Sequence, residues 1–213
     1  SADFKDKNNN VIRANLSLLN DEKIEKFSFK ESDTTNITAN ELEQKEYHVT
    51  SVTSQKRNRN PYAPFTTSTL QQSASTNLKV SPRDVMSTAQ KLYEAGLITY
   101  MRTDGIEMAP EGITSARKQI SNFLGEHYLP EKPRVFKNKA KNAQEAHECI
   151  RPTDFSKTPK NTQNLNKSEL DLYSLIWKRA LASQARAAEV LQTTVLISSF
   201  CNSAQFRLSG QVV

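Results

Sequence analysis

The first fifty residues alternate apolar and polar positions in short runs, separated by polar turns such as the three asparagines at residues 8–10. The runs cover residues 11–16, 27–29 and 47–52. Alternation with a period of two is typical of strands that bury one face and expose the other. We therefore expect β-structure from about residue 11 to residue 53.

The pattern changes after a basic connector at residues 56–60. Pro61 and Pro64 follow, and their fixed φ and missing amide hydrogens favour an extended segment. Apolar positions then recur at helical spacing, in a helix that Thr67 or Ser68 caps and that runs to about residue 76. We place a domain boundary at this connector.

The next helix shows both of its ends in the sequence. Ser81 is a favourable N-cap, Pro82 lies in the first turn where no amide hydrogen is needed, and Gly96 ends the helix. Its apolar stripe consists of Val85, Met86, Ala89, Leu92 and Tyr93. Two helices with a tight connection resemble a helix-turn-helix, but helical hairpins in proteins that do not bind DNA show the same pattern.

Two more helices are expected, at residues 110–123 and from Asn166 to about residue 185. Asn166 and Glu169 form the start of the second as a capping box. Trp177 falls on its apolar face, where we expect a core residue.

The remaining runs are β-like. One, residues 97–100, emerges directly from a helix and leads into the polar stretch 101–105, a place where a reactive side chain would be displayed. Two others, at residues 190–197 and 206–208, return to the alternating pattern. The sequence stops within such a run, which we take to indicate a piece of a longer protein.

Composition narrows the class of protein. A chain of 213 residues with 36% hydrophobic positions can bury a core. No apolar run approaches the roughly 20 residues of a membrane helix, so we expect no membrane partner and a cytoplasmic location. Lys and Arg exceed Asp and Glu by 29 − 23 = 6, a mild excess that fits a polyanionic partner but is also common elsewhere.

Several kinds of site are excluded by the sequence. Cys149 and Cys201 lack Cys-x-x-Cys spacing, so we expect reduced thiols and neither zinc nor a disulfide framework. The five glycines form no phosphate-binding loop, which makes nucleotide hydrolysis improbable. No Asp-x-Asp pair is present to hold magnesium, and we expect no metal site in these residues.

Three segments carry a family resemblance: Pro-Phe-Thr-Thr-Ser-Thr-Leu-Gln-Gln-Ser-Ala-Ser at 64–75, Leu-Tyr-Glu-Ala-Gly-Leu-Ile-Thr-Tyr-Met-Arg-Thr-Asp at 92–104, and Gln-Glu-Ala-His-Glu-Cys-Ile-Arg-Pro at 144–152. In order and approximate spacing they resemble the blocks of type IA DNA topoisomerases. The helix segment 172–179 resembles the one that follows in bacterial topoisomerase I. The resemblance spans roughly residues 45–200, and the tyrosine block is its most specific part.

The resemblance implies that Tyr100 attacks a DNA phosphodiester to form a 5′-phosphotyrosyl link, that a second strand passes through the gap, and that the break is resealed without ATP. A phenol with a pKa near ~10 needs help to react at neutral pH. Arg102 is the nearest helper, because its guanidinium can hold two phosphate oxygens, and lysine should not substitute well. Without the surrounding motif, Tyr100 would be interpreted as a core tyrosine at the end of a strand and Arg102 as a surface charge.

The resemblance also implies roles for other positions. Asp104 either orients Arg102 or tunes local protonation, or it only caps a turn. Gly105 stands where the family usually has Ser, so that hydroxyl is absent here. His147 and Arg151 match family positions that face DNA near the scissile phosphate, although a histidine on a polar loop is more often only solvated. Thr67, Ser68 and Gln71 either contact phosphates at a helix N-terminus or only cap and pack.

The resemblance also implies an α+β fold: a winged-helix-like, catabolite-activator-like domain at 54–157 that bears Tyr100, inserted into a β-rich arch at 1–53 and 158–213, the latter part beginning with a connecting helix. It implies a monomer that acts on single-stranded or negatively supercoiled DNA. The acidic domain that binds Mg²⁺ for the full-length enzyme lies outside these residues, so alone they should not cleave DNA.

Three alternatives differ in class. The leading one is a non-catalytic helix-turn-helix DNA-binding module, which predicts duplex affinity that survives Tyr100→Phe. A tyrosine recombinase fits less well, because the Arg and His cluster that it needs does not match. A structural or interaction role remains open for the β-rich parts.

Overall fold

The computed structural model describes residues 1–25, 28–29, 32–137 and 148–213. These residues form two compact units, one of residues 1–59 with 189–213 and one of residues 60–188. Each unit has its own hydrophobic core. In the described part of the chain, no helix is long and apolar enough to cross a membrane.

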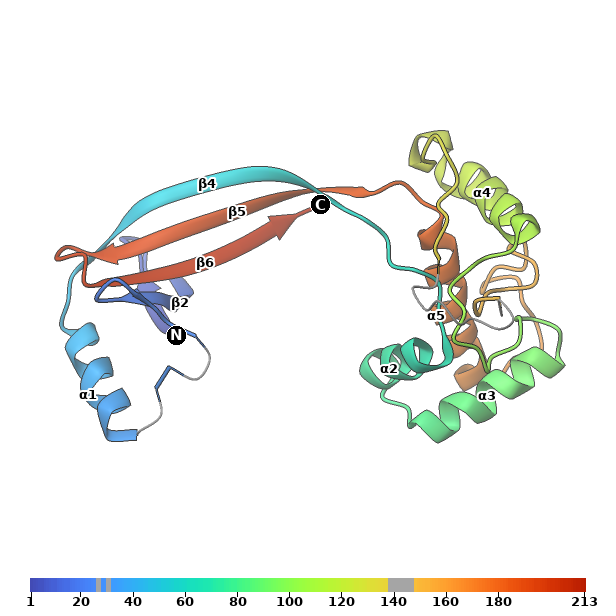
Figure 1. Cartoon of the computed structure of the whole chain (residues 1–213), viewed down its shortest axis with the longest axis horizontal. Helices are drawn as coiled ribbons and strands as arrows, with labels where there is room; N and C mark the ends of the chain where they lie inside the picture. Colours follow the sequence, from blue (N-terminus) through green and yellow to red (C-terminus); the bar gives the residue numbers. More distant parts are fainter. Residues whose placement is uncertain (26–27, 30–31, 138–147) are drawn as a thin grey trace. The chain divides into compact units, whose positions relative to one another are not determined.

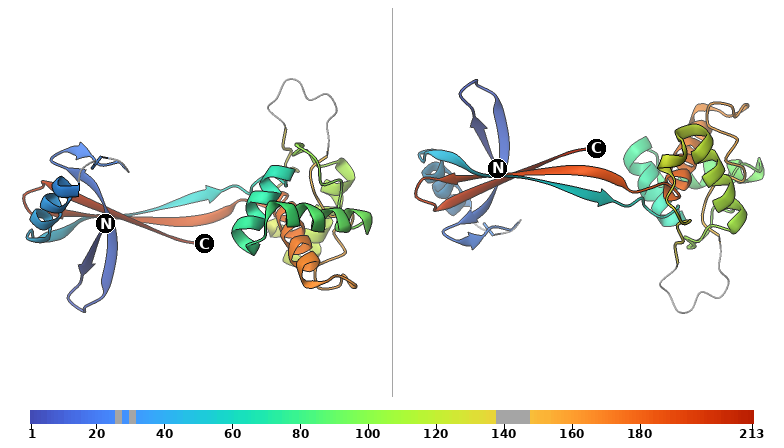
Figure 2. Two further views of the ribbon diagram at one scale, coloured as in Figure 1. Left: turned by 90° about the horizontal axis from the view of Figure 1, so that it is seen from below. Right: turned by 90° about the horizontal axis from the view of Figure 1, so that it is seen from above.

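The first unit is built on a sheet that has six strands among the described residues, in the order β1-β2-β6-β5-β4 with β3 paired to β2. The strands are β1 (Ala2–Lys5), β2 (Val11–Leu19), β3 (Glu22–Lys23), β4 (Tyr47–Arg59), β5 (Ala188–Ser199) and β6 (Ala204–Val212). The β1–β2, β2–β3, β2–β6 and β5–β6 pairs are antiparallel. Figures 1 and 2 show β4 and β5 as long strands that run side by side.

A cluster of three aromatic rings anchors this unit. Phe4, Tyr47 and Phe206 make mutual edge-to-face contacts with ring centroids 5.1 to 5.6 Å apart. Edge-to-face geometry is favourable because the positive ring edge meets the negative ring face. The cluster brings β1, β4 and β6, which are distant in the sequence, into one hydrophobic core.

The first unit departs from the sequence expectations in two ways. Helix α1 (Ser32–Glu43) lies where only β-structure was expected. Strand β4 continues through the basic residues 56–59 that were interpreted as a connector. Because β4 is the last strand in the sheet order, its outer edge is unpaired in the described chain, and exposed Lys and Arg are well tolerated there.

The second unit is helical, with α2 (Thr67–Leu78), α3 (Pro82–Glu94), α4 (Pro110–Leu124), a short 3₁₀ turn η1 (Glu126–Tyr128) and α5 (Lys167–Ser183). Helix α5 contacts α2, α3 and α4, and Figure 1 shows it between them. Trp177 on α5 is 6% exposed and its indole donates to the carbonyl oxygen of Phe155, which confirms the expected core position.

The helix ends follow the local sequence closely. Ser81 caps α3 with Pro82 in its first turn, and Asn166 forms a capping box with Glu169 at the start of α5, as expected. The cap of α2 is Thr66 rather than Thr67 or Ser68, because the Thr66 hydroxyl accepts from the amide of Thr69.

The unit boundaries also differ from the expected domain limits. The first lies after Arg59 rather than residue 53, since β4 extends to that point. The second lies after Ala188 rather than residue 157, since α5 packs within the helical unit instead of standing between two domains.

Candidate active site around Tyr100

The segment between α3 and α4 carries the candidate nucleophile. From residue 100 to residue 105, exposed and buried positions alternate without exception, and the exposed ones are Tyr100, Arg102 and Asp104. Tyr100 is 47% exposed. Among the expected strand residues 97–100, only Ile98 forms a β-bridge, an isolated one to Pro152, so the structure has no strand at the expected position. The alternation nevertheless directs the three polar side chains away from the core.

Behind Tyr100, the chain is fastened to the segment 149–153. The amide of Thr99 donates to the carbonyl oxygen of Arg151 over 2.9 Å, and the amide of Arg151 donates to the Thr99 hydroxyl oxygen over 3.0 Å. That hydroxyl in turn donates to the carbonyl oxygen of Cys149 over 2.7 Å. The amide of Thr153 donates to the carbonyl oxygen of Leu97 over 3.0 Å. The residue before Tyr100 is therefore held by hydrogen bonds of both its backbone and its side chain.

Ahead of Tyr100, the chain is fastened to the start of α2. The Thr67 hydroxyl donates to the carbonyl oxygen of Met101 over 2.7 Å, and it accepts from the amide of Thr103 over 2.9 Å. The amide of Thr67 donates to the carbonyl oxygen of Thr103 over 2.9 Å. Met101 is fully buried. An exposed phenol thus projects from a backbone that is fixed on both sides.

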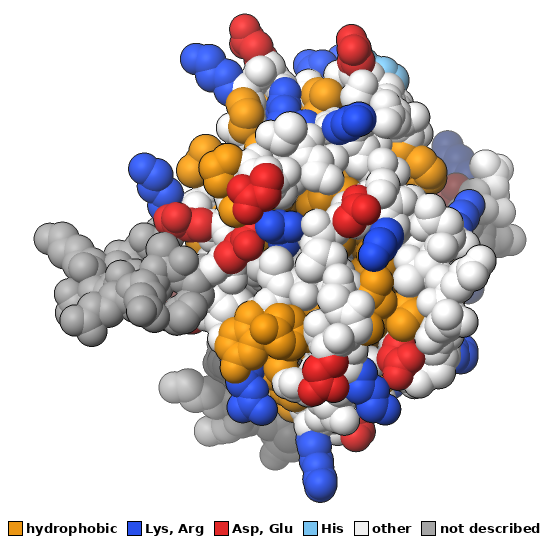
Figure 3. Space-filling model, turned by 90° about the vertical axis from the view of Figure 1, so that its right-hand side faces the viewer, with side chains coloured by type: hydrophobic (Ala, Val, Ile, Leu, Met, Phe, Trp, Pro, Cys, Tyr) orange, Lys and Arg blue, Asp and Glu red, His pale blue; other side chains and the backbone are white. Residues whose placement is uncertain are grey.

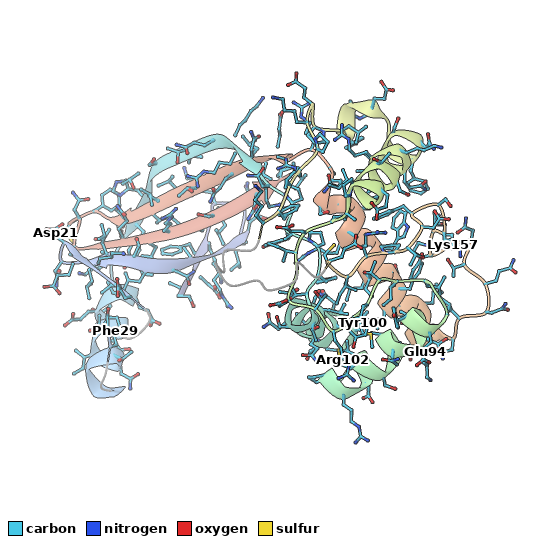
Figure 4. All side chains as sticks on the ribbon, turned by 45° about the vertical axis from the view of Figure 1, so that its right-hand side comes forward. Asp21, Phe29, Glu94, Tyr100, Arg102 and Lys157 are labelled. Atoms are coloured by element: carbon cyan, nitrogen blue, oxygen red, sulfur yellow. The ribbon has the colours of Figure 1, made fainter. Side chains whose placement is uncertain are left out.

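The phenol ring of Tyr100 contacts Tyr93 at the end of α3. The ring centroids are 5.3 Å apart with an interplanar angle of 67°, an edge-to-face arrangement. Figure 4 shows Tyr100 and Arg102 beside the end of α3, which Glu94 marks. The sequence placed Tyr93 on the apolar stripe, but the residue is 41% exposed, so the structure corrects that position. A hydrophobic pattern could not reveal this contact, because it depends on the turn that follows the helix.

Arg102 and Asp104 lie beside the phenol without contacting each other. Arg102 is exposed and forms no ion pair with a carboxylate among the described residues. Asp104 is exposed as well, and no hydrogen bond or ion pair joins it to Arg102. The amide of the buried Gly105 donates to the Thr103 hydroxyl over 2.9 Å. In this geometry Asp104 does not orient Arg102.

The start of α2 is largely satisfied by the protein itself. The amides of Thr67 and Thr69 donate to Thr103 and to the capping hydroxyl of Thr66, respectively. Of the three residues expected to contact phosphate, Thr67 uses its hydroxyl within the protein, Ser68 is exposed and Gln71 is half-buried. The geometry therefore favours a positioning role for Thr67, whose hydroxyl holds the segment after Tyr100.

Arg151 is directed into the protein. It is 6% exposed, its Nε pairs with Glu148, its Nη1 donates to the carbonyl oxygen of Pro152 over 2.8 Å, and its Nη2 lies 3.8 Å from a carboxylate oxygen of Glu111. Gly112 makes room for it, because a Cβ at that residue would lie 2.6 Å from the Arg151 Nε. The expected DNA contact of Arg151 is not supported by this placement, since the guanidinium is occupied by protein acceptors.

Two further expectations concern His147 and metals. His147 lies outside the described residues. Among the residues that are described, no group of three or more His, Cys, Asp or Glu side chains is placed to hold a metal ion. Of the carboxylates in the three motif segments, Asp104 is exposed and Glu148 pairs with Arg151.

The cysteines are both free, as expected. Burial raises the pKa of the Cys149 thiol to about 12. In the first unit, hydrogen bonds with Ser203 and Ser199, with Lys45 nearby, lower the pKa of the exposed Cys201 to about 6. Cys201 therefore differs from the ordinary thiol that the sequence indicated.

One face of the helical unit, the face in Figure 3, gives no strong electrostatic signal. This face mixes Lys and Arg with Asp and Glu and with exposed hydrophobic side chains. A mixed surface of this kind does not create a field of a single sign. The site must therefore be identified from the tyrosine segment and from similarity to known proteins.

The whole chain, residues 1–213, matches the sequence model of a family described as DNA topoisomerase. It is 45% identical over 192 residues to DNA topoisomerase 1 of Zymomonas mobilis, covering 90% of this chain and 16% of that protein. It is 43% identical over 194 residues to DNA topoisomerase 1 of Rickettsia felis, covering 86% of this chain and 25% of that protein.

A solved structure supports the same relationship. Full-length topoisomerase I from Thermotoga maritima superimposes with a TM-score of 0.69 and 30% identity, covering 93% of this chain and 32% of that chain. The chain therefore spans between a sixth and a third of the length of these relatives. With a family match over all residues and a shared mixed α+β fold, this chain belongs to the bacterial DNA topoisomerase I family.

Proposed function

We propose that this chain is the part of an ATP-independent type IA DNA topoisomerase that carries the nucleophile, and that Tyr100 is that nucleophile. The single observation that carries the proposal is the exposed phenol on a backbone fixed by Thr99 behind it and Thr67 ahead of it. A reacting atom held at a defined place gains much of its rate advantage from that placement. The full-length enzyme would relax negatively supercoiled DNA in the cytoplasm.

The chemistry exchanges one phosphate ester for another. The Tyr100 oxygen attacks the phosphorus, the bond from phosphorus to the 3′ oxygen breaks, and the phenol proton passes in the net reaction to the leaving 3′ oxygen. The protein is left with a 5′-phosphotyrosyl link, and resealing reverses these steps after a second strand has passed. Because a phosphate ester is conserved throughout, no nucleotide is needed as fuel.

Arg102 is proposed to hold the phosphate under attack. Its guanidinium is exposed two residues from Tyr100 and has no carboxylate partner among the described residues. A permanently charged, planar donor can bind two phosphate oxygens and stabilise the charge that grows on them. Ser68, Gln71, Asp104 and His147 remain proposed DNA contacts that only position the strand, and Thr67 and Arg151 act through the protein.

A magnesium ion is expected for the full-length enzyme, where it would help to neutralise phosphate charge. The described residues do not fit such an ion, because the available carboxylates do not converge. We therefore assign the metal to an acidic domain elsewhere in the same polypeptide and route no step through it here. These 213 residues alone are proposed to be inactive.

The proposed architecture is a winged-helix-like unit that bears Tyr100 and is inserted into a β-rich arch. Consecutive helices α2 and α3 and the bridges of Phe65 to Ile150 and of Ile98 to Pro152 support this likeness. The arch corresponds to the unit of residues 1–59 and 189–213. The enzyme is proposed to work as a monomer on single-stranded regions of DNA.

The experiment uses the full-length protein with a labelled single-stranded oligonucleotide and supercoiled plasmid. Tyr100→Phe should abolish both the denaturant-resistant protein–DNA adduct and plasmid relaxation while leaving salt-sensitive DNA binding in place. Tyr128→Phe changes another exposed tyrosine, at 46%, in the same unit and should retain both activities. A non-catalytic helix-turn-helix module would instead form no adduct in the unaltered protein and would bind duplex DNA sequence-specifically.

A further inference from the structure

The structure assigns a positioning role to Tyr93: its ring holds the Tyr100 phenol in the orientation from which it attacks phosphate. This inference rests on the proposed function of Tyr100. Tyr93 would act by orienting Tyr100 and would not itself touch the reacting atoms.

The contact is not a by-product of core packing. On α3 the buried stripe consists of Val85, Ala89 and Leu92. Tyr93 follows Leu92 by about 100° around the helix and lies outside that stripe, 41% exposed. Tyr100 is 47% exposed. Two large, half-exposed rings therefore contact each other at the surface, where burial in the core does not account for their arrangement.

The turn after α3 brings the two rings together. Gly96 adopts a left-handed φ of 68°, which an amino acid with a Cβ adopts at a cost. The Gly96 amide donates to the carbonyl oxygen of Tyr93 over 2.8 Å, and the Leu97 amide donates to the carbonyl oxygen of Leu92 over 2.9 Å. This is a Schellman ending, which reverses the chain. Seven residues after Tyr93, Tyr100 consequently lies against the end of the same helix.

A fixed backbone alone does not fix the phenol. An exposed tyrosine has three staggered rotamers about its first side-chain bond, and each of them carries the phenol oxygen to a different place. The edge-to-face contact, at 5.3 Å and 67°, favours the rotamer in which the rings meet. The Thr99 and Thr67 hydrogen bonds thus place the backbone of Tyr100, and Tyr93 selects its side-chain orientation.

The contact requires a ring and not the Tyr93 hydroxyl. Tyr93→Phe should therefore behave as the unaltered protein, whereas Tyr93→Leu keeps an apolar side chain of helical preference but loses the ring. Tyr128→Leu is the matched control, because Tyr128 is 46% exposed and its ring contacts His127 instead.

The first measurement uses the present chain and does not depend on activity. With ring-labelled tyrosine, NMR should show the Tyr100 ring shifted by the neighbouring ring current, in the unaltered chain and in Tyr93→Phe alike. The shift should disappear in Tyr93→Leu and persist in Tyr128→Leu. A Tyr100 spectrum that is the same in Tyr93→Leu would overturn the inference.

The second measurement follows single-turnover cleavage of an oligonucleotide by the full-length enzyme. At saturating DNA, Tyr93→Leu should slow cleavage about two- to tenfold. This factor corresponds to the interaction energy of an edge-to-face pair of aromatic rings. Its Kd for the oligonucleotide should stay unchanged, and Tyr93→Phe should restore the rate. If the rate is unchanged while Tyr100→Phe abolishes the adduct, the inference fails and the proposed function stands.

Two other outcomes are decisive. A weakened Kd with an unchanged rate at saturation would overturn the inference, because Tyr93 would then act as a stacking surface for a DNA base. An adduct that survives Tyr100→Phe would overturn the proposed function and, with it, the catalytic part of the inference. The ring-current result would then still decide whether Tyr93 orients Tyr100.

Discussion

The hydroxyl of Thr67, the first residue of α2, donates a hydrogen bond of 2.7 Å to the carbonyl oxygen of Met101, directly after the candidate nucleophile. The same hydroxyl oxygen accepts from the amide of Thr103. The contact therefore ties a helix start to the segment that displays Tyr100. Thr67 thereby has a structural explanation that does not need a phosphate contact.

Thr67→Val removes this hydroxyl with little change of shape. It leaves the Met101 carbonyl and the Thr103 amide without a partner, so the free energy of unfolding should fall by about 1 to 3 kcal/mol. Trp177, the single tryptophan, lies in the core of the helical unit and reports its unfolding by fluorescence in urea. Thr67→Ser keeps the hydroxyl, so its free energy of unfolding should fall clearly less. Equal decreases for Thr67→Val and Thr67→Ser would contradict the hydrogen-bonding role.

Arg151 is expected to act as a structural clamp. Arg151→Met removes the partner of Glu148 and leaves the Pro152 carbonyl without its donor, so the helical unit should lose roughly 3 kcal/mol of stability in urea. Glu111→Gln is the control, because Glu111 is 75% exposed and its contribution should be under about 1 kcal/mol.

The same Arg151→Met variant tests the rival DNA-contact role in the full-length protein. A lost phosphate contact would reduce the slope of log affinity against log salt by about 1. We expect the slope to stay the same. A stable variant with a reduced slope would show that Arg151 faces DNA after all.

Gly112→Ala should reverse the usual helix preference. Alanine normally stabilises a helix relative to glycine by up to about 1 kcal/mol. Here the new Cβ would lie 2.6 Å from Arg151 Nε, and that guanidinium is held by Glu148 and Pro152. We expect Gly112→Ala to destabilise the unaltered protein but to stabilise the Arg151→Met background, as a double-mutant cycle in urea would measure. If Gly112→Ala changed the free energy of unfolding in the same direction in both backgrounds, the steric clash with Arg151 would be refuted.

The two cysteines should differ sharply in reactivity. The pKa of Cys201 is lowered to about 6 and that of Cys149 is raised to about 12, so at pH 7 Cys201 is mostly thiolate and Cys149 is thiol. Because the thiolate is the nucleophile, iodoacetamide should label Cys201 with a half-maximal rate near pH 6 and should spare Cys149 in the folded chain. Peptide mass spectrometry distinguishes the two sites, and Ser203→Ala should move the labelling midpoint upward. Equal labelling of both at pH 7 would contradict the assignment.

Local signals in the sequence predicted the helix ends best. Ser81 with Pro82, Gly96, and Asn166 with Glu169 act within one helical turn, so their effect does not depend on the rest of the fold. Helix α1 was missed because its sequence is mostly polar and offers no apolar stripe. The basic end of β4 was mistaken for a connector because a strand at the end of a sheet can expose every side chain, which removes the alternation.

The candidate site was predictable only in part. The tyrosine block indicated Tyr100 and Arg102 as candidates, and the structure leaves both exposed. The Tyr93 ring contacts Tyr100 because the chain reverses after α3. The Thr67 hydroxyl contacts Met101 because α2 packs against the tyrosine segment. A hydrophobic periodicity along the sequence predicts neither contact. The burial of Arg151 between Glu148 and Gly112 is a tertiary property, which its place in a sequence motif does not reveal.

The most direct test of the account maps the covalent adduct. The full-length protein is reacted with a single-stranded oligonucleotide, the adduct is trapped with denaturant, and the DNA-linked peptide is sequenced by mass spectrometry. We predict a phosphodiester link between the Tyr100 oxygen and the 5′ phosphate of the cleaved strand, with a free 3′-hydroxyl on the other product. A link to any other residue, or to a 3′ phosphate, would contradict the account.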